Sequence, residues 1–395
     1  MFATRDLPMT EVRVDSWGPE RPQGGSGSAA NLGWLAMVGI LYALGTTIPL
    51  YGVDPQAVLA AMTSVGMDAG TRLSIFGLGL IPLFMPLAFL ELAKLFIPRL
   101  ARWQVASAPN MFRLNDYVRL AAFAAAALQG YGIATAMEQM PGVVPDPGAG
   151  FIVATMSTYV GSTALLAWLA DRISRRGLGN GFWLLWIVPF VSVLLLRSLQ
   201  LLDLARTGAM SPAFLPTCLG LLLISGMVIV VANLATVDGI LPRNGRVPAP
   251  SQAWRARLTT QVLIWPPLLA NIVIGVIVAP LYLLLSGSGI APGWLHYGSG
   301  GHIFLFGVLT LFLAYAYARE APNWRPDIAE VFGSETEPKG LPAPFWLFGL
   351  MQVAVCASWE LLASRSPMDF LAGSSLITVV TVVMNFTRPW RLRLS

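Results

Sequence analysis

Long apolar stretches make up most of this chain, and short segments rich in Arg, Gly and Pro separate them. About 20 apolar residues are needed for a helix to cross a hydrocarbon core of roughly 30 Å. Ten such runs occur, at residues 32–50, 73–97, 114–137, 149–170, 181–202, 211–236, 259–285, 301–319, 343–363 and 369–387. The pattern predicts an all-α membrane protein with ten transmembrane helices.

The second run differs from the others because prolines interrupt it. Pro82 and Pro86 lie inside its apolar stretch, and the weakly amphipathic segment 55–67 precedes it. Broken backbone at membrane depth is tolerated only where it faces protein or a water-filled cavity. We therefore predict an interrupted or re-entrant second helix.

Charge supports the membrane assignment and gives the orientation. Only 11% of the residues are charged, against about 25% in soluble proteins. With the N-terminus inside, only four of the 25 Lys and Arg residues fall on the outer side: Arg72, Arg197, Arg206 and Arg365. Cytoplasmic loops of membrane proteins carry an excess of Lys and Arg, so both termini are predicted to be cytoplasmic. The net charge of +5 then indicates contact with anionic lipid rather than direct nucleic-acid binding.

The ten runs divide into two sets of five between polar ends. Residues 1–31 predict a flexible cytoplasmic tail and residues 389–395 a basic cytoplasmic tail. Helices one to five fall in 32–203 and helices six to ten in 204–388. Such halves often form an inverted repeat with a pathway between them, so we expect a five-plus-five inverted repeat.

Residues suited to catalysis or metal binding are few. Cys218 and Cys356 lie in apolar runs, where a cysteine usually acts as a small buried hydrophobe. His296 and His302 lie in a Gly-rich connection and form no zinc or general-base arrangement. We therefore expect no enzyme, no catalytic residue, no metal site and no cofactor.

Ionisable residues inside the runs are also sparse. Glu91 and Lys94 stand three residues apart, on one helical face, and we expect an ion pair near the cytoplasmic end of the second helix. Glu360, and Asp203 with Arg197, are interpreted as residues at the membrane interface.

Five motifs occur in order along the chain: IPLYGVDP (48–55), SIFGLGLIP (74–82), DYVRLAAFAAAALQGYGIAT (116–135), DRISRRGLGNG (171–181) and FLAGSSLITVVTVVMNF (370–386). Together they resemble the SecY family, the central subunit of the Sec protein-conducting channel. The resemblance covers residues 34–387 and implies the ten-helix fold and a passive conduit for unfolded polypeptides across the membrane, or for apolar segments into it.

The resemblance implies a pore ring of apolar side chains at mid-membrane, which blocks ions while yielding to a peptide. The matching positions are Leu80, Phe84, Phe182, Trp186, Leu269 and Thr378. Aromatic residues replace the usual aliphatic ones, and Thr378 adds a hydroxyl, so the tightness of the seal is open. Ordinary helix packing or lipid contact is the alternative reading of each position.

The resemblance also implies a lateral gate held by a small polar cluster between helices. Gln129 and Gln261 occupy matching positions, and Gln261 stands where the family usually has Asn. Hydrogen bonds between helices in lipid are worth only about 0.6–2 kcal/mol, so such a gate could open for an apolar segment. Static contact between helices is the alternative.

Cytoplasmic turns are the docking sites for a ribosome or a motor ATPase in the family. The matching residues are Arg172, Arg175, Arg176, Asn180, Arg243, Arg246, Arg255 and Arg257. A simple tight turn explains the glycines of 171–181 equally well. The loop at 319–340 is acidic, and acidic residues repel RNA phosphates, so we expect weakened docking. Residues 56–73 replace the family's plug helix, which is predicted to be reduced or missing.

The resemblance further implies a small SecE-type membrane subunit, an unfolded polypeptide as substrate, and a multi-pass location in a bacterial inner (plasma) membrane. A SecG-type subunit, a motor ATPase and a ribosome stay open as further partners. The alternative function is a small-molecule transporter on an inverted-repeat fold, which needs a polar site at the midplane. Few candidates exist for one beyond the two gate glutamines, Asn233, Asn271 and Asn385.

Overall fold

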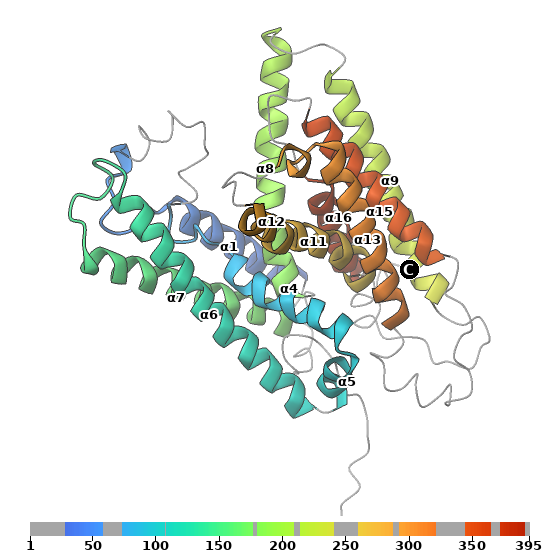
Figure 1. Cartoon of the computed structure of the whole chain (residues 1–395), viewed down its shortest axis with the longest axis horizontal. Coiled ribbons are helices and arrows are strands. Elements are labelled where there is room, and N and C mark those ends of the chain that lie inside the picture. The colour runs from blue at the N-terminus through green and yellow to red at the C-terminus, as the bar shows by residue number, and fades with distance from the viewer. Residues whose placement is uncertain are drawn as a thin grey trace, which may run out of the picture. The chain divides into compact units, whose positions relative to one another are not determined.

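The computed structural model describes residues 28–57, 73–106, 108–176, 180–208, 214–240, 260–286, 292–320, 344–364 and 372–391. Helices account for nearly all regular structure in these ranges (Figure 1). They are α1 (Ser28–Thr47), α4 (Ile81–Phe96), α5 (Pro98–Ala106), α6 (Ala108–Glu138), α7 (Ala149–Arg175), α8 (Gly181–Arg206), α9 (Phe214–Ile240), the π-helix η1 (Thr260–Ile264), α11 (Trp265–Ile272), the π-helix η2 (Val273–Val278), α12 (Ala279–Ser286), the 3₁₀-helix η3 (Gly293–Leu295), α13 (Gly300–Glu320), α15 (Pro344–Ala363) and α16 (Gly373–Arg391).

The all-α membrane fold predicted from the sequence is confirmed. Six described helices are long and apolar enough to cross a membrane, and the bent pair α4–α5 adds a seventh candidate. Shorter apolar helices cover 33–47, 347–363 and 373–387. Each of the ten predicted apolar runs therefore contains one of these helices or, in the seventh run, a series of helical segments.

The second run is interrupted, as predicted, but its sharp bend is not at the prolines named from the sequence. Residues 73–80 form turns, and Pro82 lies in the first turn of α4, where a missing N–H breaks no helical bond. The chain bends by 115° between α4 and α5. Ile97 at the bend precedes Pro98, and a residue before proline is disfavoured in helical geometry. Pro98 thus accounts for the position of the bend.

The chain separates into two compact units. The first contains residues 1–94 and 99–182, and the second contains 95–98 and 183–395. Nearly all of α8 is grouped with the second unit by this division. The halves 32–203 and 204–388 were predicted as the two copies of an inverted repeat, which is a different division from these compact units. The inverted repeat stays a prediction.

The core of the first unit lies at one end of the α6–α7 pair. These two helices pack side by side in Figure 1. Buried side chains around Leu50, Leu73, Met137 and Tyr159 form this core. Backbone hydrogen bonds from Leu50 N to Leu73 O, and from Ile75 N to Ile48 O, both 3.0 Å long, hold the two chain segments that enter it.

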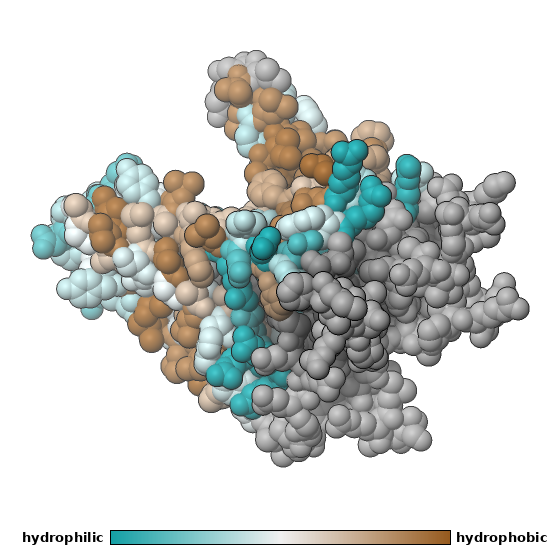
Figure 2. Space-filling view, turned by 90° about the horizontal axis from the view of Figure 1, so that it is seen from below, coloured by the Kyte–Doolittle hydropathy of each residue, from teal (hydrophilic) through white to brown (hydrophobic). Residues whose placement is uncertain are grey.

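The core of the second unit lies among α9, α11, α13, α15 and α16, which pack against one another. Ile229, Leu263, Tyr317 and Ile377 have no exposed surface there. Figure 2 shows brown, hydrophobic residues over much of the described surface on one side of the molecule. Exposed apolar side chains such as Leu223 and Met227 suit contact with lipid.

Candidate functional site

Three predicted ring residues lie in the first unit. The Phe84 N–H donates to the Leu80 carbonyl at 2.9 Å, so the two residues stand one helical turn apart at the start of α4. Both side chains are buried, and so is Phe182 in the first turn of α8. All three side chains are thus enclosed by protein, which fits both a seal and ordinary helix packing.

The other three ring residues lie in the second unit. Leu269 on α11 and Thr378 on α16 are fully buried, and Trp186 on α8 meets Phe190 edge to face at 5.9 Å between ring centroids. The Thr378 hydroxyl donates to the Ser374 carbonyl at 2.8 Å. Because that donor is used within its own helix, Thr378 adds less polarity than its residue type suggests. That all six residues form one ring stays a prediction, since the ring draws on both units.

The two gate candidates lie on different units and are described separately. Gln129 is half-buried on α6, and its Oε1 has no hydrogen-bond partner within the described part of the chain. Gln261 is buried on η1, a segment of π-helix. A buried amide oxygen without a donor is unfavourable, so Gln129 is suited to accept a hydrogen bond. The pairing of the two amides stays a prediction.

The Gly-rich turn after α7 is held by side chains of its own. The Ser174 hydroxyl accepts the Gly181 N–H at 2.9 Å, and Asn180 Oδ1 accepts the Phe182 N–H at 3.1 Å. A Cβ at Gly181 would lie 2.0 Å from the Ala170 carbonyl oxygen. Asn180 thus caps α8 and Gly181 permits close helix packing. These roles support the tight-turn reading for both residues.

The arginines of the same turn are exposed, and two of them stack on tryptophans. The Arg176 guanidinium lies 4.4 Å from the Trp34 ring centroid, and that of Arg172 lies 5.4 Å from the Trp168 ring. Arg175 is also exposed. Cation–π contacts of this kind hold a guanidinium in place and leave its edge free to meet an anion. All three arginines of this turn are therefore exposed at the surface, and docking on them stays a prediction.

Some predicted positions lie outside the described residues. They are the docking candidates Arg243, Arg246, Arg255 and Arg257, most of the plug segment 56–73, most of the acidic loop 319–340, and most of the two tails.

Two ion pairs connect charged residues in the first unit. Lys94 Nζ lies 2.6 Å from Glu91 Oε1 and both side chains are buried, which confirms the predicted pair. The sequence did not predict the second pair, in which Arg119 Nη2 on α6 lies 2.7 Å from Asp171 Oδ2 on α7. An ionisable residue inside a transmembrane helix usually has a partner on another helix. The charged residues at positions 119 and 171 were therefore the sequence feature from which this ion pair could have been predicted.

A buried polar cluster in the second unit was also missed. His302 Nδ1 lies 2.5 Å from Glu360 Oε1, and the Gly298 N–H donates to the same oxygen at 2.7 Å. Gly298 has a φ of +86°, which a residue with a side chain rarely adopts. Glu360 is 2% exposed, so its side chain is buried in protein, and its place at the membrane interface stays a prediction. Its buried carboxylate fastens the loop before α13 to α15.

A small-molecule transporter would need polar side chains at its substrate site. Two of the candidate amides, Asn233 and Asn271, make contacts within the second unit. Asn233 Nδ2 donates to the Ile229 carbonyl at 2.9 Å and to Thr381 Oγ1 at 3.1 Å. Asn271 Nδ2 lies 3.4 Å from Ser374 Oγ. These amides join helices to one another, as polar residues between transmembrane helices commonly do.

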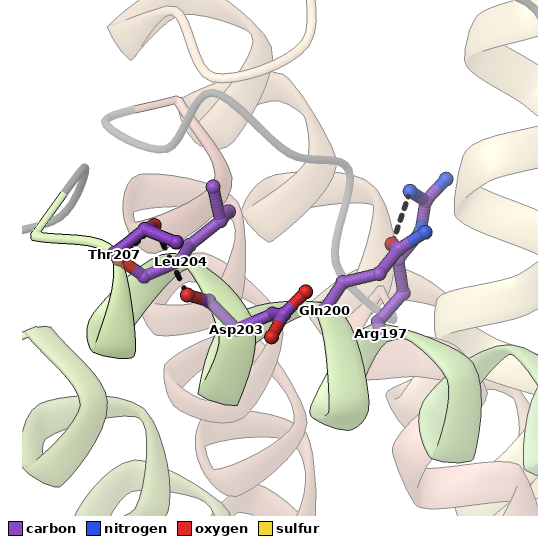
Figure 3. A pocket seen from close by; sticks show the side chains of 5 residues that line it. All are labelled: Arg197, Gln200, Asp203, Leu204 and Thr207. Atoms are coloured by element: carbon purple, nitrogen blue, oxygen red, sulfur yellow. Dashed lines mark hydrogen bonds between the residues drawn. The ribbon is translucent and has the colours of Figure 1, made fainter.

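A hollow lies along one face of α8 near its C-terminal end. Its volume is about 380 Å³, and Figure 3 shows the five side chains that line it: Arg197, Gln200, Asp203, Leu204 and Thr207. Arg197 Nη1 donates to Gln200 Oε1 at 2.9 Å. Three of the five side chains are exposed, so this shallow surface does not resemble an enclosed transporter site.

Comparisons with known proteins support the helical membrane fold. The family model named SecY matches residues 74–334. The protein translocase subunit SecY of Haemophilus influenzae is 32% identical over 205 residues, which are 49% of this chain and 45% of that protein. The SecY subunit of Aquifex aeolicus is 29% identical over 192 residues, 44% of each chain. The match thus spans about half the length of these relatives.

Solved channel structures share the fold over nearly the whole chain. Sec61 in the canine ribosome–channel complex from the endoplasmic reticulum has a TM-score of 0.59 at 14% identity, covering 95% of both chains. A solved protein-conducting channel has a TM-score of 0.55 at 14% identity, again over 95% of both. Because the family model covers well over half of the sequence, the chain belongs to the SecY family.

Proposed function

We propose that this chain is the channel subunit of a protein translocase, a passive conduit for unfolded polypeptides across the membrane and for apolar segments into it. The observation that carries the proposal is the SecY family match over residues 74–334, on a multi-pass helical fold. The chain would act without catalytic residues or a cofactor, because a bound partner supplies the energy.

The proposed seal is the ring of Leu80, Phe84, Phe182, Trp186, Leu269 and Thr378. Five of the six side chains are buried, and the Thr378 hydroxyl bonds to its own helix. A hydrophobic constriction excludes ions because it dewets, while an extended peptide can push apolar side chains apart. The aromatic members make this a bulkier seal than an aliphatic ring.

The proposed lateral gate pairs Gln129 with Gln261. Both side chains are amides, which can donate and accept at once, and the Oε1 of Gln129 lacks a donor among the described residues. A contact of about 0.6–2 kcal/mol would keep the gate closed at rest and still yield to a sufficiently apolar segment.

The proposed orientation places both termini in the cytoplasm of a bacterium, with the chain in the inner membrane. Around the bend after α4, Arg99, Arg102 and Arg113 are exposed beside the exposed rings of Trp103 and Phe112. Arginine with tryptophan is typical of a segment at the membrane–water interface, and the arginines favour anionic headgroups. The suitability of this surface for anionic lipid supports the orientation.

The proposed partners are a SecE-type subunit, an unfolded polypeptide, and a motor ATPase or ribosome that docks on Arg172, Arg175 and Arg176. These arginines are exposed. A SecG-type subunit is a further candidate. The acidic sequence at 319–340 supports weaker ribosome docking, because carboxylates repel RNA phosphates.

Peptide-gated conductance tests the proposed function. The purified chain with its SecE-type subunit would be placed in a planar bilayer, and the ion current measured before and after addition of a signal peptide. We expect low resting conductance and discrete openings with the peptide, and none with a scrambled peptide of equal charge. A current that never responds to signal peptide would contradict the proposal.

A further inference from the structure

The seventh apolar run loses backbone hydrogen bonds at a pair of prolines. The carbonyl of Val262 would accept from residue 266 in an α-helix and from residue 267 in a π-helix. Both positions are proline, which has no N–H. The carbonyl of Leu263 likewise loses its α-helical donor at Pro267. The prolines therefore leave two neighbouring carbonyls without their usual partners.

These carbonyls cannot be satisfied by water. Val262 is 1% exposed and Leu263 has no exposed surface. A buried carbonyl without a hydrogen bond is unfavourable, and the great majority in proteins are paired. A donor from elsewhere in the fold is therefore required at this point of the helix.

The Gln352 side chain on α15 supplies that donor. Its Nε2 lies 2.7 Å from the Val262 carbonyl oxygen and 3.2 Å from that of Leu263. Gln352 itself has no exposed surface. One amide group thus serves both carbonyls that the prolines deprive of donors, and joins α15 to η1.

We propose that Gln352 is a positioning residue for the gate: its amide stands in for the N–H groups missing at Pro266 and Pro267. It thereby holds the π-helical segment that carries Gln261, and this role in the gate rests on the proposed function. The Oε1 of Gln352 is buried without a partner among the described residues. The desolvation of this oxygen offsets part of what the two donor contacts contribute, so the net contribution is that of about one ordinary hydrogen bond. A contact of about this size holds the segment and still lets it move when the gate opens.

A rescue experiment tests this assignment. Gln352→Met keeps the length of the side chain and removes its N–H groups. In the purified full-length protein, we expect amide hydrogen exchange in residues 260–272 to rise about tenfold, which corresponds to a hydrogen bond of ordinary strength. In a Pro266→Ala/Pro267→Ala background the backbone supplies its own donors, and Gln352→Met should then change exchange by less than about twofold.

Ser225→Ala is the matched control. It removes the hydrogen bond from Trp359 Nε1 to Ser225 Oγ, 3.2 Å long, which also joins α15 to a neighbouring helix but involves no proline. Its effect should be the same in both backgrounds. An equal effect of Gln352→Met with and without the prolines would overturn the proposal.

Gln352→Glu gives a second test that needs no change at the prolines. In this buried site the new carboxyl group is protonated, so it carries one O–H donor in place of the two N–H groups of the amide. It can therefore serve only one of the two carbonyls, and exchange in 260–272 should rise, by less than it does for methionine. Exchange equal to that of the wild type would overturn the assignment. Both tests measure backbone exchange without any translocating peptide, so their outcome is independent of whether signal peptide opens the channel.

Discussion

Arg119 Nη2 on α6 lies 2.8 Å from Oδ1 and 2.7 Å from Oδ2 of Asp171 on α7, so one guanidinium nitrogen meets both carboxylate oxygens. Fifty-two positions separate the two residues in the chain. Asp171 begins the motif that carries the exposed arginines 172, 175 and 176. The ion pair therefore fastens the α6–α7 pair directly beside the proposed docking turn.

Loss of this ion pair should destabilise the first unit. Asp171→Asn leaves the Arg119 guanidinium partly buried without its counter-charge, and we expect a loss of about 2 kcal/mol. Thermal unfolding of the purified protein in detergent measures this. Arg172→Gln is the control, because it removes only an exposed cation–π contact worth about 0.5–1 kcal/mol. Equal effects of the two variants would show that the ion pair contributes no more to stability than the exposed cation–π contact.

The buried carboxylate of Glu360 should fix the loop at 292–299. Glu360→Ala leaves the Gly298 N–H and the His302 ring without their acceptor, and we expect a loss of about 2–3 kcal/mol. Protease cleavage within 292–299 should become correspondingly faster. Glu360→Gln keeps an acceptor oxygen at the same place and should preserve most of the protection. A loop that stays resistant in Glu360→Ala would refute this account.

Gly181 should not tolerate a side chain. A Cβ there would lie 2.0 Å from the Ala170 carbonyl oxygen, so Gly181→Ala forces the first residues of α8 away from α7. We expect a loss of at least about 2 kcal/mol in unfolding free energy. Gly226→Ala on α9 is the matched control, since no atom lies within 4 Å of its Cβ position. Alanine there should be neutral or stabilise the helix by up to about 1 kcal/mol. The same result at both positions would contradict the predicted close packing.

The proposed seal makes a prediction at Thr378. Because its hydroxyl already bonds to the Ser374 carbonyl, Thr378→Val should leave the resting conductance unchanged within about twofold. Thr378→Asp places a charge at the same position and should hydrate the constriction, raising resting conductance about tenfold or more. Planar-bilayer recordings without signal peptide compare the two. Equal resting currents in both variants would remove Thr378 from the seal.

The helices were predictable from the sequence because an apolar run of about 20 residues is long enough to cross the membrane as a helix. Ile97 before Pro98 also indicates the bend after α4, because a residue before proline is disfavoured in helical geometry. The π-helix at 260–264 was not predicted, although Pro266 and Pro267 stood beside it. Proline shows where a backbone bond is lost, but not which distant side chain replaces it.

The polar contacts were less predictable than the helices. Arg119 with Asp171, His302 with Glu360, and Gln352 with Val262 are separated by 52, 58 and 90 positions. No periodic pattern connects residues so far apart, because their contact depends on how whole helices pack. The ring is harder still to predict, because its members come from both units. Only the resemblance to a known family pointed to these six positions.

Crosslinking to a translocating chain tests the central claim most directly. A photoreactive amino acid would be placed singly at Leu80, Phe84 or Trp186, in membranes that contain the SecE-type subunit and a stalled secretory polypeptide. Leu223 and Leu284 are the controls, since they are 72% and 80% exposed, as expected for lipid-facing positions. We expect adducts with the polypeptide from the three ring positions and none from the controls. No adduct from any ring position, with the partner subunit bound, would contradict a protein-conducting channel.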